Sequence, residues 1–86
     1  MSRLYFENVV DVNTPHPYVF VYMLEEGETF SPSAFAPFMD LTVEEDRSLL
    51  MTVFESAKPV SLTLDQWTEI ARVAKEYHEE TLQNYD

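Results

Sequence analysis

Residues 63–82 read TLDQWTEIARVAKEYHEETL and carry the strongest structural signal in the chain. Apolar side chains recur every three or four positions and fall on one face of a helix: Trp67, Ile70, Ala71, Ala74, Tyr77, His78 and Leu82. Thr63 and Gln66 match a capping box, in which two side chains accept hydrogen bonds from unpaired backbone amides at the helix start. The sequence therefore predicts an amphipathic helix over residues 64–82, whose apolar face must pack against another layer.

Two segments upstream predict a β-hairpin that can supply that layer. Residues 3–12 largely alternate between apolar and polar side chains, which is the period of a half-buried strand. Residues 18–24, YVFVYML, are aromatic or aliphatic throughout, which is typical of a strand covered on both faces. Pro15 and Pro17 place a turn between the two strands. Gly27 ends the second strand, where we expect a positive φ.

Residues 43–57 predict a second helix, although a strand over part of this range remains an alternative. The run Thr42–Glu45 matches a capping box. The apolar residues that follow share one helical face before Pro59: Val43, Leu50, Val53, Phe54 and Ala57. Residues 49–54 also have β character, since Met51-Thr52-Val53-Phe54 contains β-branched and aromatic side chains.

These elements together predict the α+β class. We expect a small antiparallel sheet, built from the N-terminal hairpin with room for a third strand at residues 60–62, packed by two amphipathic helices. Tyr18, Phe20 and Tyr22 would then lie on the other face of the sheet, and residues 29–39 are the nearest candidate cover. A chain of 86 residues has room for one hydrophobic core, so we expect a single domain over residues 1–86.

The charge of the chain limits its partners. There are 16 Asp and Glu residues against 5 Lys and Arg, giving a net charge of −11. This charge repels nucleic acid and anionic lipid, because phosphate binding needs clustered Lys and Arg. We expect basic proteins as partners and no direct contact with nucleic acid. The sequence shows no long apolar run and no signal-peptide pattern, so we expect no membrane contact and a cytoplasmic location.

The sequence offers little for catalysis. There is no cysteine, and neither His16 nor His78 has a companion at metal-ligand spacing. His78 is better explained as a partly buried side chain with a hydrogen bond. A single glycine cannot build a phosphate-binding loop. We therefore expect no enzyme activity, no metal and no cofactor.

Three groups of acidic residues can be distinguished, and only two of these groups have a local structural explanation. Glu69, Glu76, Glu79 and Glu80 lie on the outer face of the predicted helix 64–82, where they can form a row resembling a nucleic-acid backbone or a solvated face paired with Arg72. Glu44, Glu45 and Asp46 would stabilise the start of the predicted helix 43–57. Glu25, Glu26 and Glu28 have no such role.

These features predict a binding protein. The candidate partner-binding residues are Glu25, Glu26, Glu28, Glu69, Glu76, Glu79, Glu80, Phe35 and Phe38; the two phenylalanines could instead complete the core. The leading hypothesis is an inhibitor of a nuclease, toxin or DNA- or RNA-binding complex that occupies the basic surface of its partner, as toxin-immunity and phage anti-defence proteins do. The alternative is a structural or regulatory module, such as a homodimer through the open face of the hairpin.

Overall fold

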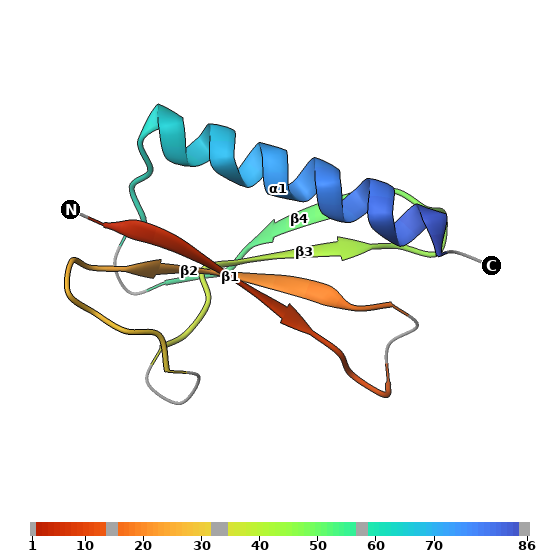
Figure 1. Ribbon diagram of the computed structural model, residues 1–86, viewed down its shortest axis with the longest axis horizontal. Helices are drawn as coiled ribbons and strands as arrows, with labels where there is room; N and C mark the ends of the chain where they lie inside the picture. The colour runs from red at the N-terminus through yellow and green to blue at the C-terminus, as the bar shows by residue number, and fades with distance from the viewer. Residues whose placement is uncertain (1, 14–15, 32–34, 57–58, 85–86) are drawn as a thin grey trace.

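One helix lies across a face of a four-stranded antiparallel sheet in a computed structural model of the chain (Figure 1). The structure describes residues 2–13, 16–31, 35–56 and 59–84. The elements are β1 (Arg3–Val9), β2 (Tyr18–Leu24), β3 (Met39–Val43), β4 (Leu49–Val53) and α1 (Leu64–Gln83). The strands are hydrogen-bonded in chain order, so the sheet is a simple meander.

The hydrophobic core lies between α1 and the two central strands. Val19 and Val21 of β2 pair with Leu41 and Met39 of β3, and none of these four side chains is more than 2% exposed. Ile70 of α1, together with Ala74, packs into the same cluster. Burying a side chain of this size contributes about 1.5 to 3 kcal/mol, so this layer dominates the stability of the fold.

The prediction for α1 is confirmed, and so is the pairing of the N-terminal hairpin, but β1 ends at Val9 instead of residue 12 and Pro15 of the predicted turn lies outside the described residues. Thr63 Oγ1 accepts a hydrogen bond from Gln66 N at 3.1 Å, and Gln66 Oε1 accepts one from Thr63 N at 2.9 Å. Gln66 Nε2 also donates to the Ser2 carbonyl at 3.3 Å, which ties the start of α1 to the start of β1. Gly27 has a φ of 86°, as expected from its place in the turn after β2.

The prediction of two helices is wrong, because β3 and β4 replace the helix expected over residues 43–57. Thr42 lies within β3, and the strand alternative is confirmed, with β4 one residue shorter than the range 49–54. The turn between the strands is closed by Arg47 N donating to Glu44 O at 2.8 Å and Glu44 N donating to Ser48 O at 2.9 Å. The sheet's third and fourth strands thus come from residues 39–53, and residues 60–62 form no strand.

A helix and a strand compete over residues 43–57, and pairing of β4 with β3 decides the outcome. Met39 and Leu41 of β3 pair with β2 in either case. A helix over residues 43–57 would leave the hydrogen-bonding groups on the other side of β3 unpaired, which is costly in a buried strand. The capping-box match at Thr42–Glu45 contributes only about 1 kcal/mol and cannot offset that loss.

Replacing Ile70 by alanine tests the central role of α1 in the core. Ile70 is 0% exposed, so Ile70→Ala should lower the free energy of unfolding by about 2 to 5 kcal/mol, measured by urea denaturation. Leu64→Ala is the control on the same helix, because Leu64 is 81% exposed and its truncation should change stability by no more than about 0.5 kcal/mol. Equal effects of the two substitutions would contradict the placement of α1.

Candidate functional site

The β3–β4 turn and the C-terminal half of α1 meet at one end of the molecule. His78 Nε2 lies 2.8 Å from the Arg47 carbonyl oxygen. Because a carbonyl can only accept, Nε2 carries the proton of this hydrogen bond. The expectation of a partly buried, hydrogen-bonded His78 is therefore confirmed. Six exposed carboxylates lie at this end, which we call the acidic end: Glu44, Glu45, Asp46, Glu76, Glu79 and Glu80. Glu76 and Glu80 are about 160° around the helix axis from His78, so they lie on the side of α1 away from the turn.

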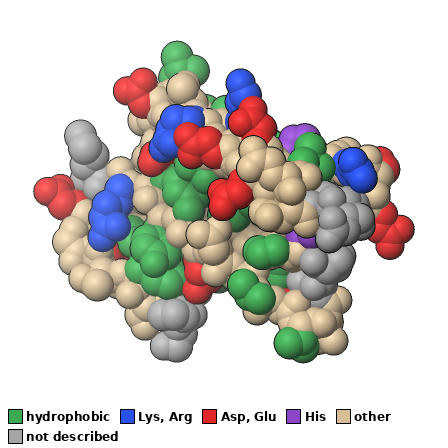
Figure 2. All heavy atoms as spheres, turned by 45° about the vertical axis from the view of Figure 1, so that its right-hand side comes forward, with side chains coloured by type: hydrophobic (Ala, Val, Ile, Leu, Met, Phe, Trp, Pro, Cys, Tyr) green, Lys and Arg blue, Asp and Glu red, His purple; other side chains and the backbone are tan. Residues whose placement is uncertain are grey.

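The acidic end is electrostatically unfavourable for folding. A helix C-terminus carries partial negative charge, which Lys and Arg normally stabilise. The last turn of α1 contains no basic residue. Arg72 pairs with Glu76 at 3.1 Å, as predicted, but both side chains are exposed and such a pair contributes only a few tenths of a kcal/mol. Figure 2 shows acidic side chains among the few cations along the top of the molecule, where Figure 1 places α1. A functional explanation is thus favoured for these acids.

The structural role predicted for Glu44, Glu45 and Asp46 is wrong, because no helix begins there. Asp46 instead accepts hydrogen bonds from the Ser48 amide at 3.0 Å and from the Ser48 hydroxyl. These hydrogen bonds lower the pKa of the Asp46 carboxyl, so it stays charged at neutral pH. Asp46 therefore shapes the turn and contributes charge to the acidic end.

Glu25, Glu26 and Glu28 lie at the opposite end of the sheet. Leu24, which precedes them, pairs with Arg3 at the start of β1, and a seven-residue strand spans about 20 Å. Glu28 accepts a hydrogen bond from the Glu25 amide at 2.6 Å, and the Arg3 guanidinium donates to the Glu28 carbonyl. Glu28 thus has a structural role that the sequence did not reveal. Glu69 is half-buried in the first half of α1, away from the acidic end.

Phe35 and Phe38 both contribute to packing. Phe38 is buried, with 7% of its surface exposed, in the core beneath α1. Phe35 stacks on Phe30 with ring centroids 6.2 Å apart, and Phe30 stacks on Tyr5 at 4.1 Å. Phe30 and Phe35 therefore cover part of the far face of the sheet, as predicted for the range 29–39, of which residues 32–34 lie outside the described residues.

Two ionisable groups are buried on that far face. The Tyr22 hydroxyl donates to Glu7 at 2.8 Å, and burial, reinforced by this hydrogen bond to a carboxylate, raises the pKa of Tyr22 to about 12. Asp40 lies opposite Phe20 and Thr52 in the sheet. Burial raises the pKa of the Asp40 carboxyl, although hydrogen bonds from Thr52 act in the other direction. The hydrogen bond of Tyr22 ties β2 to β1, and both groups lie outside the acidic end.

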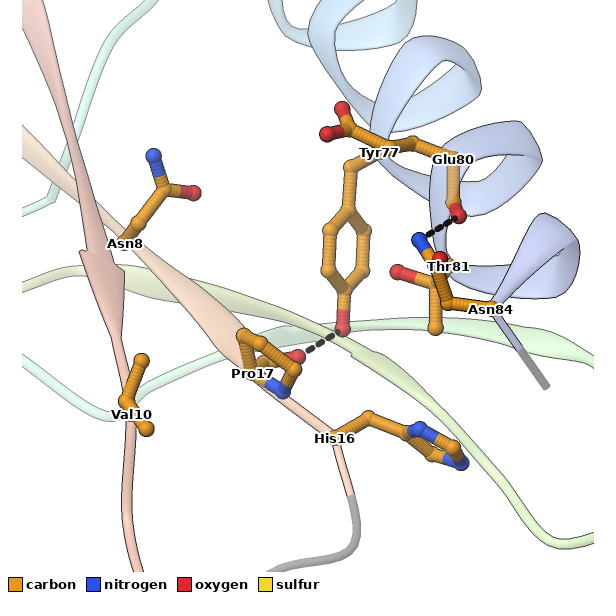
Figure 3. A pocket seen from close by; sticks show the side chains of 8 residues that line it. All are labelled: Asn8, Val10, His16, Pro17, Tyr77, Glu80, Thr81 and Asn84. Carbon is orange, nitrogen blue, oxygen red and sulfur yellow. Dashed lines mark hydrogen bonds between the residues drawn. The ribbon is translucent and has the colours of Figure 1, made fainter. Parts of the chain in front are cut away.

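A cavity of about 260 Å³ opens beside the acidic end, between the β1–β2 connection and α1 (Figure 3). Its lining residues are Asn8, Val10, His16, Pro17, Tyr77, Glu80, Thr81 and Asn84. Tyr77 reaches across from α1 and donates to the Pro17 carbonyl at 2.7 Å, while Asn84 Nδ2 donates to the Glu80 carbonyl at 3.0 Å. The cavity is smaller than ordinary small-molecule sites. Its polar groups are largely engaged in holding α1 to β2.

The described ranges are residues 2–13, 16–31, 35–56 and 59–84. No cluster of three His, Asp or Glu side chains within them is placed to hold a metal ion. No helix in these ranges is long and apolar enough to cross a membrane. Comparisons of the chain with protein-family models, curated proteins and solved structures found no match.

The raised pKa of Tyr22 predicts a loss of stability at alkaline pH. Its ordinary value is 10.0 and its folded value is about 12, so the unfolded chain ionises first as the pH rises. The contribution of Tyr22 should be complete below pH 10 and lost as the pH approaches 12. Urea denaturation at several pH values should show a shallower fall for Tyr22→Phe than for the unmodified chain. Parallel curves would contradict the burial of this hydroxyl beside Glu7.

Proposed function

We propose that the protein is an inhibitor whose acidic end occupies the basic, nucleic-acid-binding surface of a nuclease, toxin or other DNA- or RNA-binding complex. The observation that carries this proposal is the convergence of six exposed carboxylates from the β3–β4 turn and α1 at one end. They gather beside a helix terminus where basic residues would favour stability and none is present in the last turn.

The spacing of the carboxylates suits a surface that binds phosphates. Glu76 and Glu80 are one helical turn apart, about 6 Å along the axis, which is comparable to the distance between neighbouring phosphates of a strand. Arg and Lys form charge-assisted hydrogen bonds with carboxylates as they do with phosphates. An occupied surface would exclude the nucleic acid, so inhibition would be competitive.

The rest of the molecule supports this mechanism. The hydrogen bond between His78 and Arg47 holds the turn against α1, so the carboxylates of the two segments keep a fixed arrangement. The net charge of −11 steers a basic partner toward the protein and accelerates association at low salt. A module that binds through the open face of the hairpin has less support, because Phe30 and Phe35 already pack on that face.

Charge reversal at the acidic end tests the proposal. Glu79→Lys/Glu80→Lys should abolish capture of a basic partner from the native cell, because it removes two carboxylates and adds two repelling cations. The same variant should be at least as stable as the unmodified chain in thermal unfolding, since lysine suits a helix C-terminus. Glu25→Lys/Glu26→Lys is the matched control: it changes the net charge equally at the opposite end and should retain the partner.

Nucleic acid must also compete with the protein for binding to the captured partner. Duplex DNA or structured RNA should displace the protein from it, and affinity should fall about tenfold or more between roughly 50 and 300 mM salt. Equal capture by the acidic-end variant and the unmodified chain would overturn the proposal. So would a partner that does not bind nucleic acid.

A further inference from the structure

The edge of the sheet at β4 lacks the features that usually block strand pairing. In the described chain β4 pairs with β3 on one side only. Its sequence, LLMTV, contains no charged residue and no proline. The opposite edge, β1, carries Arg3 and Glu7. Natural sheets protect an exposed edge with charges, proline or a cover, so the bare edge at β4 needs a separate explanation.

The backbone groups that face outward follow from the ladder between β3 and β4. Phe54 N donates to Phe38 O at 2.8 Å, and Glu44 N donates to Ser48 O at 2.9 Å. Residues of an antiparallel strand alternate between facing the partner and facing away. The even-numbered residues from 48 to 54 therefore bond toward β3. Leu49, Met51 and Val53 direct their amide and carbonyl groups toward the open edge.

Apolar side chains surround this open edge. Met51 and Val53, on the face that α1 crosses, are 39% and 62% exposed, and Leu50 on the other face is 46% exposed. Trp67, 48% exposed, lies within about 20° of His78 around the helix axis. Because His78 contacts the β3–β4 turn, Trp67 lies on the β4 side of α1. We call Leu50, Met51, Val53 and Trp67 the β4 edge patch.

We propose that the β4 edge patch binds a second copy of this chain, through antiparallel pairing of the two β4 strands about a two-fold axis at Met51. Met51 would pair with Met51 of the second copy, and Leu49 with its Val53. Each of these pairs would exchange two backbone hydrogen bonds. The proposed dimer would have a continuous eight-stranded sheet, with Met51 and Trp67 of both copies packed across the axis.

Charge favours a second copy over another occupant. In a two-fold dimer a strand pairs with a copy of itself, so a charged residue in the strand can face a like charge. β4 contains no charged residue and therefore avoids this repulsion. Arg47 precedes β4 and Glu55 follows it, so antiparallel pairing brings Arg47 of one copy toward the end of β4 at which Glu55 of the other lies. A basic partner, in contrast, would find no carboxylate within the patch.

Hydrodynamic measurements on the full chain test the dimer. The molar mass measured by light scattering after size exclusion should be that of a dimer when the protein is at about 100 µM. Val53→Lys should raise the dissociation constant about tenfold or more, because lysine blocks an edge strand and would place a charge against Leu49 of the second copy. Val12→Lys is the control: Val12 is 98% exposed in the β1–β2 connection, and this variant should remain dimeric. Circular dichroism must show that both variants are folded.

A single cysteine at Met51 tests the register, since the natural chain has no cysteine. Cα atoms of a hydrogen-bonded antiparallel pair lie about 5.5 Å apart, within the range of a disulfide. Met51→Cys should therefore form a covalent dimer with diamide, whereas Val12→Cys should remain largely monomeric on a denaturing gel. A folded Met51→Cys dimer that does not cross-link would overturn this register.

Other outcomes would overturn the second copy as the occupant. An unmodified chain that stays monomeric up to about 100 µM would leave the edge to a strand of another protein. A Val53→Lys variant that dimerises as well as the unmodified chain would place the interface elsewhere. Salt separates this proposal from the inhibitor proposal: screening should leave the dimer unchanged or strengthen it, while it weakens binding through the acidic end.

Discussion

A single helix must cover a sheet that is wider than the helix, and most features of this protein follow from that mismatch. An α-helix with its side chains is about 10 to 12 Å across, whereas four strands spaced by about 4.8 Å span more than 14 Å before side chains are added. Ile70 and Ala74 cover β2 and β3, and β4 lies partly beyond their reach. Within the described residues no helix lies on the far face, and Phe30 and Phe35 cover part of it instead.

The same geometry assembles the acidic end. The meander brings the β3–β4 turn to the end of the sheet toward which α1 runs, and His78 fastens the two together. Carboxylates separated by about thirty residues in the chain thus lie at the same end of the molecule. By itself, the β3–β4 turn resembles an ordinary solvated turn, and the end of α1 resembles an ordinary solvated helix face. The carboxylates destabilise the fold because the two segments meet at the negatively polarised helix terminus.

The sequence was informative where the signal was local. Helix 64–82 could be predicted from its period and from Thr63 and Gln66, because a capping box and an apolar stripe act within the element itself. β4 could not be separated from a helix, since Met51 and Val53 remain exposed and the turn residue with positive φ is Arg47, which carries no turn signature. The acidic end was missed for a related reason: acids 44–46 were assigned to the start of a helix, but they form the turn of the β3–β4 hairpin instead.

The unequal edges of the sheet determine how far strand pairing could extend. A sheet whose two edges are both bare can add copies without limit, which is the route to fibres. Here Arg3 and Glu7 mark the β1 edge, and only β4 is bare. Pairing through β4 would therefore cover the unprotected edge of each copy, and assembly would stop at the dimer. The large negative charge makes copies of the chain repel one another, which opposes aggregation through the exposed apolar strand.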